Sequence, residues 1–211
     1  MKPDIKKYDK WTGENMRRFD NWAESYDNSI LNPVFAYAHY KVINSLSPDD
    51  RKILDIGCGT GKLLSKVYAL DKKRELVGID FSEDMIKIAK QKRGGHIDYL
   101  VADSSALPFK DNYFDAIVNT FSFHHYIQQE KVLGEMNRVL KPKGKLCIVD
   151  HSFSHPPGLI YLMSPILNLL EGPVKINKRG EMKKMLKEQG FSVLSSRSFT
   201  LIGTLYKCEK I

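Results

Sequence analysis

From residue 51 onward, short apolar runs rich in β-branched residues alternate with stretches whose apolar residues recur at helical spacing. The runs expected to form strands are residues 52–56, 75–80, 98–101, 113–118 and 145–150. The stretches expected to form helices are residues 62–70, 83–92 and 128–140. A Lys-Pro-Lys-Gly turn at 141–144 leads into the last strand. This alternation predicts an α/β fold built on a parallel sheet with crossover helices.

The last part of the chain departs from this alternation. Residues 179–189 predict a helix that ends at Gly190, and two strand-like runs follow at 191–199 and 201–208 with almost no linker. A link this tight implies antiparallel pairing. We therefore expect a mostly parallel, seven-stranded sheet that ends in an antiparallel hairpin and carries helices on both faces.

Two further segments lie outside the strand and helix alternation. Residues 1–45 form an expected helical cap, with helical patterns at 15–29 and 34–45. Residues 151–178 hold four prolines around an apolar stretch and are expected to form an insertion near the active site, because ligands of open parallel sheets bind at the carboxyl ends of strands. The whole chain, 1–211, is expected to form a single domain.

The composition changes this expectation little. The chain has 211 residues, of which 42% are hydrophobic and 27% charged, which suits one globular domain. Its three cysteines lie far apart, which argues against a disulfide framework and a thiolate zinc site. The amino terminus is charged and no apolar stretch is long enough to cross a membrane, so we expect a cytoplasmic protein without a membrane span.

The net charge of +8 raises the question of a nucleic-acid partner. The lysines are scattered among acidic residues, and the arginines that read bases or phosphates are few. A solvated, lysine-rich surface is therefore favoured over a nucleic-acid binding surface.

A glycine-rich loop joins the first predicted strand to the first predicted helix, with the sequence Asp55-Ile56-Gly57-Cys58-Gly59-Thr60-Gly61-Lys62. Glycines let a ligand approach the backbone, so the loop indicates a site for a nucleotide-like molecule. A P-loop would need glycine at Ile56 and Ser or Thr at Leu63, and a dinucleotide-binding loop would need glycine at Lys62. An ATPase and an NAD-linked oxidoreductase are therefore disfavoured. What remains is Gly-x-Gly-x-Gly after an acidic residue, which suits a ligand with a sulfonium and an amino-acid end.

Several segments resemble the motifs of the class I S-adenosylmethionine-dependent methyltransferases. The residues similar to the first motif, the third motif, the fourth strand and the entry to the fifth strand are 53–61, 101–109, 114–120 and 138–146. Residues 19–27 resemble the segment before the sheet in small-molecule methyltransferases, including the ubiquinone and menaquinone biosynthesis type. The resemblance implies a Rossmann-like class I methyltransferase fold with S-adenosylmethionine as cofactor and S-adenosylhomocysteine as product.

The resemblance also assigns residues to the cofactor. Asp80, at the end of the second strand, matches the ribose-binding acid, and Asp103 matches the acid near the adenine edge, with Ser104 beside it. Asn119 and Thr120 end the strand that faces the reacting methyl group. The full set of expected cofactor-binding residues is Tyr26, Asp55, Gly57, Cys58, Gly59, Gly61, Asp80, Phe81, Met85, Asp103, Ser104, Asn119 and Thr120.

The candidate catalytic residue is His125, which follows the fourth strand. A histidine there could take a proton from the acceptor, because its ordinary pKa lies near working pH. The alternative is a histidine that packs against the cofactor or ends the loop by hydrogen bonding. A metal site is not expected, because His124, His125, His151 and His155 have no helix-spaced His/Glu pair or cysteine partner.

The sequence therefore predicts a methyltransferase that acts on a small-molecule acceptor. The apolar stretch within 151–178 suggests an apolar or aromatic acceptor. Methylation of RNA or protein and a non-catalytic cofactor-binding module stay open as alternatives. The motif of amino-methylating nucleic-acid enzymes is absent after the fourth strand, where this chain has Asn119-Thr120-Phe121-Ser122, and no cysteine suited to cytosine methylation lies between Cys58 and Cys147.

Overall fold

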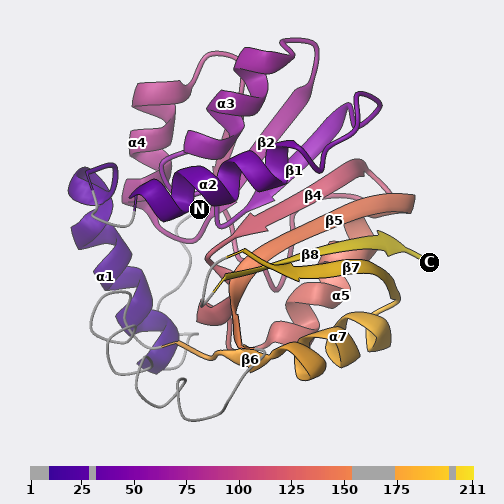
Figure 1. The fold of residues 1–211 in the computed structure, drawn as a ribbon. Helices are drawn as coiled ribbons and strands as arrows, with labels where there is room; N and C mark the ends of the chain where they lie inside the picture. The colour runs from indigo at the N-terminus through magenta and orange to yellow at the C-terminus, as the bar shows by residue number, and fades with distance from the viewer. Residues whose placement is uncertain (1–9, 29–31, 154–173, 200–202) are drawn as a thin grey trace.

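The computed structural model describes residues 10–28, 32–153, 174–199 and 203–211 of the chain (Figure 1). Its strands are β1 (Lys52–Ile56), β2 (Glu75–Asp80), β3 (Asp98–Val101), β4 (Phe114–Thr120), β5 (Leu140–Phe153), β6 (Asn177–Lys178), β7 (Phe191–Ser198) and β8 (Gly203–Lys210). Its helices are α1 (Lys10–Tyr26), α2 (Asn32–Ile43), α3 (Lys62–Leu70), α4 (Glu83–Arg93), the 3-10 helix η2 (Phe123–His125), α5 (Gln129–Val139) and α7 (Arg179–Glu188).

One sheet organises the molecule, with the strand order β3-β2-β1-β4-β5-β8-β7. The strands from β3 to β5 run parallel, and β8 is antiparallel to both β5 and β7. The predicted mostly parallel sheet with a terminal antiparallel hairpin is thus confirmed. The structure adds a short strand that the sequence did not predict, because β6 pairs with the end of β5 over two residues.

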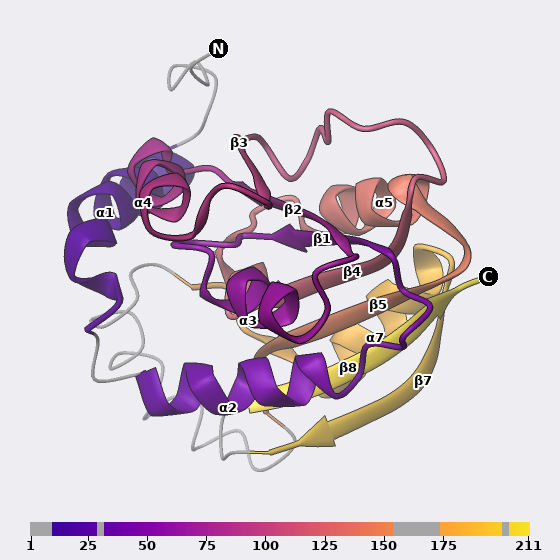
Figure 2. The same ribbon diagram turned by 90° about the horizontal axis from the view of Figure 1, so that it is seen from above.

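Helices cover both faces of the sheet (Figure 2), because successive strand residues point to opposite sides. In β1, Ile53 packs in the cluster formed with α2 and α3, whereas Leu54 packs in the cluster formed with α5 and α7. Cys147 and Ile148 repeat this division in β5. Each nearly continuous apolar strand therefore contributes side chains to two hydrophobic cores, one on each face of the sheet. Packing on both faces holds the carboxyl ends of the strands in place.

The start of β5 differs from the sequence prediction. The strand begins at Leu140, which pairs with Phe114, whereas Lys145 pairs with Ala116. Residues 141–144 therefore form a bulge within the strand rather than a turn before it, and Lys143 adopts a left-handed backbone conformation with φ of 61°. The bulge allows a longer strand than the apolar pattern alone indicates.

The segments outside the alternation are placed as follows. The first two helices are confirmed, but α1 begins and ends earlier than the predicted 15–29, and α2 begins and ends earlier than the predicted 34–45. Most of the predicted insertion lies outside the described residues, since only its ends, in β5 and from residue 174 onward, are described. None of the helices in the described ranges has the length and apolar content that crossing a membrane would require.

Candidate functional site

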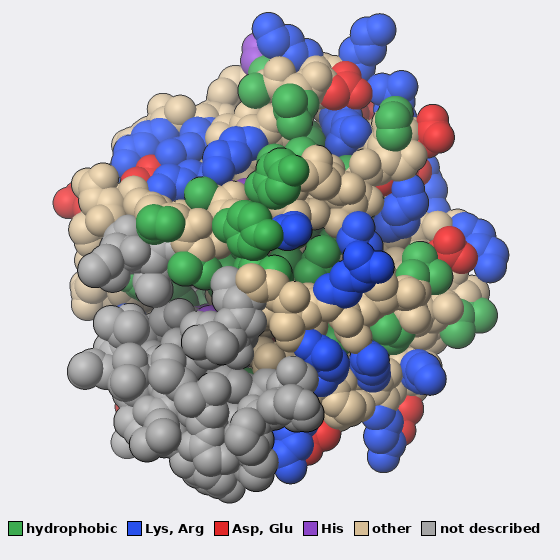
Figure 3. Space-filling view, in the orientation of Figure 1, with side chains coloured by type: hydrophobic (Ala, Val, Ile, Leu, Met, Phe, Trp, Pro, Cys, Tyr) green, Lys and Arg blue, Asp and Glu red, His purple; other side chains and the backbone are tan. Residues whose placement is uncertain are grey.

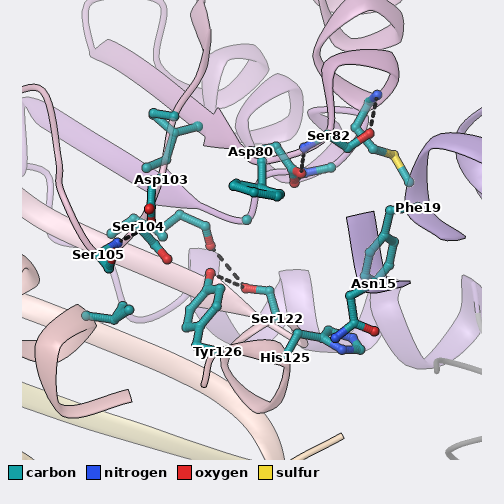
Figure 4. A pocket seen from close by; sticks show the side chains of 18 of the residues that line it. Asn15, Phe19, Asp80, Ser82, Asp103, Ser104, Ser105, Ser122, His125 and Tyr126 are labelled. Atoms are coloured by element: carbon teal, nitrogen blue, oxygen red, sulfur yellow. Dashed lines mark hydrogen bonds between the residues drawn. The ribbon is translucent and has the colours of Figure 1, made fainter. Parts of the chain in front are cut away.

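A pocket of about 210 Å³ opens at the carboxyl ends of β1, β2 and β4 (Figure 4). The strand order reverses at β1, which lies between β2 and β4, and such switch points are the usual ligand sites of open α/β sheets. The predicted site residues that line the pocket are Tyr26, Gly57, Gly59, Asp80, Phe81, Met85, Asp103, Ser104, Thr120 and His125. Residues far apart in the sequence, from α1 to η2, therefore meet at one cavity.

The glycine loop has a backbone that only glycine fits well. Gly57 and Gly61 have φ of 73° and 80°, in the left-handed region. A Cβ atom on Gly57 would lie 2.3 Å from the Ser122 Oγ, and one on Gly61 would lie 2.3 Å from the Tyr99 hydroxyl oxygen. The backbone N–H groups of Gly57 and Cys58 both donate to the carbonyl of Ile79, at 2.8 and 2.9 Å. The loop is thus fixed to the end of β2.

Asp80 is oriented by the backbone on both sides of it. Its carboxylate accepts hydrogen bonds from the Gly59 N–H at 2.8 Å and from the Ser82 N–H at 3.0 Å. Burial raises the pKa of Asp80 above its ordinary value, although these hydrogen bonds act in the opposite direction. The carboxylate is therefore a preorganised acceptor on the pocket wall.

Four predicted cofactor residues do not line the pocket: Asp55, Cys58, Gly61 and Asn119. Asp55 is 1% exposed, and neither of its carboxylate oxygens has a hydrogen-bond partner among the described residues. Burial, together with the charge of Asp80, raises the pKa of Asp55 to about 8. Asp55 is therefore a mainly protonated, buried group behind the pocket at neutral pH.

Asn119 supports the pocket from behind through its side-chain amide. Its Nδ2 lies 2.8 Å from the Ile56 carbonyl oxygen, 2.7 Å from the Ser122 Oγ and 3.1 Å from the Tyr126 hydroxyl. Ser122 and Tyr126 line the pocket, and the two hydroxyl groups lie 3.0 Å apart (Figure 4). The sequence reasoning missed both residues, although their place just after the fourth strand was an available signal.

Helix α1 supplies a side of the pocket that the sequence reasoning captured only at Tyr26. Asn15 and Phe19 also line the cavity, and the Phe19 ring meets the His125 ring edge-on, with centroids 4.9 Å apart. The helix packs on α4 through Ala23 and Met85, in a small cluster of its own. The spacing of Asn15 and Phe19, one helical turn apart, was a signal that both share a face.

Asp27, just after α1, joins this helix to the glycine loop. Its carboxylate accepts from the Thr60 hydroxyl and from the Arg93 guanidinium, both at 2.7 Å. Partial burial acts to raise the pKa of Asp27, but the hydrogen bonds from Thr60 and Arg93 lower it to about 2. This charged junction ties the end of α1 to the glycine loop and to the end of α4.

His125 lies on the pocket wall next to a buried histidine. The His124 ring centroid is 4.1 Å from that of His125 and 4.7 Å from that of His151, and the His124 Nδ1 is hydrogen-bonded to Asp150. His124 itself is buried and does not line the pocket. Among the described residues, no group of three or more His, Cys, Asp or Glu side chains is arranged to hold a metal ion.

Comparison with known proteins gives a domain match and sequence relatives. Residues 54–148 match the methyltransferase domain family. The chain is 37% identical over 154 residues to a demethylmenaquinone methyltransferase of Renibacterium salmoninarum, covering 70% of this chain and 62% of the relative. It is 34% identical over 147 residues to the ubiquinone/menaquinone biosynthesis C-methyltransferase UbiE of Wigglesworthia glossinidia brevipalpis, covering 64% and 58%. The chain thus spans about three fifths of the length of these curated relatives.

Solved structures with the same architecture extend the likeness to most of the chain. A chain from a Haloferax volcanii complex of the Trm112 methyltransferase activator with a methyltransferase superposes with a TM-score of 0.76 at 18% identity, covering 91% of this chain and 96% of that one. A geranyl diphosphate methyltransferase in complex with S-adenosylmethionine gives 0.71 at 16% identity, covering 83% and 85%. At these identities the likeness shows the fold alone.

Proposed function

We propose, from the premise that the chain belongs to the class I S-adenosylmethionine-dependent methyltransferase family, that it transfers a methyl group from this cofactor to a small-molecule acceptor. The observation that carries the proposal is the convergence of the glycine loop, Asp80 and His125 on one pocket at the switch point of the sheet. We further propose that residues 1–211 act as one domain, with 1–45 as a cap and 151–178 as an insertion beside the acceptor.

The described residues fit the cofactor on one side of the pocket. A Cβ atom on Gly59 would meet nothing closer than the Tyr26 ring at 3.8 Å, so the loop backbone is open to a ligand at this point. We assign the ribose hydroxyls to the preorganised Asp80 carboxylate and the adenine amine to Asp103. Phe81 and Met85 supply the apolar surface on which a base and a thioether can pack.

The cofactor supplies an activated methyl group, so the protein has to hold the acceptor in line with it and exclude water. We assign proton removal from the acceptor to His125, which lies on the pocket wall. Phe19 holds the His125 ring through the edge-on contact. Tyr126 and Ser122, fixed by Asn119, offer hydroxyl groups that can orient a polar substituent of the acceptor.

For the acceptor we propose an apolar or aromatic ring that carries a hydroxyl group. The named relatives act in menaquinone and ubiquinone biosynthesis, and the acceptor side of this pocket is lined by Phe19, Ile127 and Val132. An apolar wall with a few hydroxyl groups is the composition expected of a site for such a molecule.

Calorimetric titration of the purified chain with S-adenosylmethionine, S-adenosylhomocysteine and NAD tests the cofactor. Saturable binding of the first two alone is expected, and binding of neither would overturn the proposal. The acceptor is then tested by chromatography of reaction mixtures with demethylmenaquinol and simpler aromatic hydroxyl compounds. Methyl transfer to a member of this panel is expected. Cofactor binding without transfer to any of them, or to RNA and protein acceptors, would identify a non-catalytic module instead.

A further inference from the structure

The outward face of α2 is unusual for a helix in contact with water. The helix buries Phe35, Ala38, His39 and Val42 against the sheet. The exposed residues of the helix itself are Pro33, Ala36, Tyr37 and Tyr40. None of these is charged, whereas the solvent face of a surface helix is ordinarily charged or polar. Tyr37 and Tyr40 are 43% and 58% exposed.

These two tyrosines belong to a continuous aromatic ridge. The rings of Tyr37 and Tyr40 are stacked with centroids 6.3 Å apart, and the Phe199 ring at the end of β7 lies 5.6 Å from that of Tyr37. The Lys41 ammonium lies 5.0 Å from the centroid of the Tyr37 ring. The ridge is thus ordered by its own contacts and carries a cation at its side.

Cations flank the ridge on both sides. Burial lowers the pKa of His39 of α2 to about 3, and the positive charge of the nearby Lys66 of α3 acts in the same direction. On the other side, Lys207 of β8 pairs in register with Cys147, which packs in the cluster beneath α2. Among the described residues, neither Lys41, Lys66 nor Lys207 forms an ion pair with an acidic side chain.

The elements around the ridge also lack acidic residues. Helices α2 and α3 and strand β7 contain no Asp or Glu, and the one acidic residue of β8, Glu209, is paired with Lys143. Figure 3 shows this face, with hydrophobic side chains over α2 among Lys and Arg side chains and the visible acidic side chains toward its margins. The face is therefore suited to a partner that combines negative charge with an apolar region.

We propose that this α2 surface, formed by Tyr37, Tyr40, Lys41, Lys66 and Lys207, docks on an anionic phospholipid bilayer. Tyrosine rings are favoured at the level of lipid headgroups, where one part of the ring is in an apolar and the other in a wet environment. Lysines next to them are attracted by the negative surface potential of anionic lipids. The α2 surface provides both groups, because its exposed tyrosines lie between lysines.

A bilayer fits these observations better than a single-stranded nucleic acid. Bases stack on free aromatic ring faces, but the Tyr37 ring is already in contact with Tyr40, Phe199 and Lys41. The cations that define the surface are lysines, which act as point charges rather than as the planar groups that read phosphates in pairs. On the buried side of α2, Phe35 stacks on the pocket residue Tyr26, so the proposed surface is on the side of the helix that faces away from this contact.

Co-sedimentation of the full chain with vesicles tests the proposal without cofactor or acceptor, so it does not depend on the proposed reaction. Binding is expected to vesicles of phosphatidylcholine with phosphatidylglycerol, and not to phosphatidylcholine alone. The triple variant Lys41→Gln/Lys66→Gln/Lys207→Gln is expected to lower the partition coefficient by about 100-fold, since each lysine contributes about fivefold. Tyr37→Ser/Tyr40→Ser is expected to lower it by about tenfold.

Matched variants distinguish a specific surface from net charge. Lys183→Gln/Lys184→Gln/Lys187→Gln on α7 changes the net charge equally, from +8 to 8 − 3 = +5, and is expected to keep binding within about threefold. Leu100→Ser, at an exposed apolar site on β3, controls for the tyrosines. The proposal would be overturned if both lysine triple variants lost binding equally, or if the wild type did not bind anionic vesicles. It would also be overturned if the chain bound single-stranded DNA instead of vesicles, with the same sensitivity to the variants.

Discussion

The two sides of the pocket are held by different kinds of contact. On the side assigned to the cofactor, the backbone groups of Gly57, Cys58 and Gly59 bond to the end of β2, within one short stretch of sequence. On the side assigned to the acceptor, side chains from distant segments meet, as Phe19 of α1 meets His125 of η2. The cofactor side is fixed by the backbone conformation of the glycine loop, and the acceptor side by how α1 packs on α4.

This difference shows where the protein can vary and where it cannot. A site made from backbone groups depends on residues that permit one particular backbone, so a single added atom disrupts it. A site made from side chains on a docked helix can change its shape by substitution without loss of the fold. We therefore expect the cofactor side to be intolerant of substitution and the acceptor side to determine specificity.

The largest effect is expected for Gly57→Ala. Its Cβ atom would lie 2.3 Å from the Ser122 Oγ and 2.6 Å from the Ser122 Cβ, at a φ of 73° that is already strained for alanine. Strain and overpacking together amount to about 4 kcal/mol in the native backbone conformation, and alanine relieves them only by displacing the loop from the pocket wall. Because cofactor binding then has to restore that conformation, cofactor affinity should fall by about 1000-fold in calorimetric titration.

Gly95→Ala is the matched control for this substitution. Gly95 also has a positive φ, of 98°, but a Cβ atom there would meet nothing within 4 Å. The control should lose about 1 kcal/mol of unfolding free energy and retain wild-type cofactor affinity. A Gly57→Ala variant that binds the cofactor as the control does would show that the backbone of the loop does not define the site.

On the acceptor side, His125→Gln separates turnover from cofactor binding. Loss of the proposed proton acceptor should lower kcat by about 100-fold, because general-base catalysis contributes about that much. The cofactor Kd should change by less than about twofold, since Asp80 and the glycine loop are untouched. His96→Gln, at an exposed position, is the control. An equal change in Kd and kcat would mean that His125 belongs to the cofactor side.

A smaller effect, about 30-fold on cofactor affinity, is expected for Asp80→Asn, in which an amide replaces the proposed ribose acceptor. Because burial raises the pKa of Asp80, wild-type affinity should fall as the pH is lowered, beginning at a higher pH than for an ordinary aspartate. Titrations at several pH values should show this fall in the wild type and its absence in the variant. The same pH dependence in both proteins would assign it to another group.

The same contrast explains which parts of the fold could be predicted from the sequence. The bounds of β1, β2, β3 and α3 agree with the sequence prediction, because each is an apolar pattern bounded by residues that end it. Strand β6 was missed because two polar residues, Asn177 and Lys178, pair with β5 through their backbone only. The bulge in β5 was missed because Leu140, in the predicted helix, pairs with Phe114.

The site divides in the same way. The glycine loop pointed to a ligand site because glycines follow directly after a predicted strand, and Asp80 was assigned by the family resemblance. Both line the pocket, because they follow the carboxyl ends of adjacent parallel strands. Asn15 and Phe19 were missed because their place depends on how α1 packs against α4, which no local pattern determines. Asn119 was predicted as a cofactor residue, but its side chain points behind the pocket, to Ile56 and Ser122.

The smallest effect on cofactor affinity, less than about threefold near pH 6, is expected for Asp55→Asn, because an amide resembles the protonated carboxyl group. The effect on stability should depend on pH. The folded carboxyl has a pKa of about 8 and the unfolded one about 4, so the folded state binds the extra proton between these values. Wild-type unfolding free energy should therefore fall as pH rises through this window and level off above it.

The unfolding free energy of the Asp55→Asn variant should not fall over this pH range, so near pH 8 it should exceed that of the wild type by on the order of a few kcal/mol. Denaturant titrations at several pH values measure this difference. Asp98→Asn, at an exposed position on β3, should leave the pH profile unchanged. Parallel profiles for the wild type and Asp55→Asn would mean that Asp55 is ionised in the folded protein. In that case the buried acid beneath the glycine loop would carry a charge, in addition to the two acids, Asp80 and Asp103, that line the pocket.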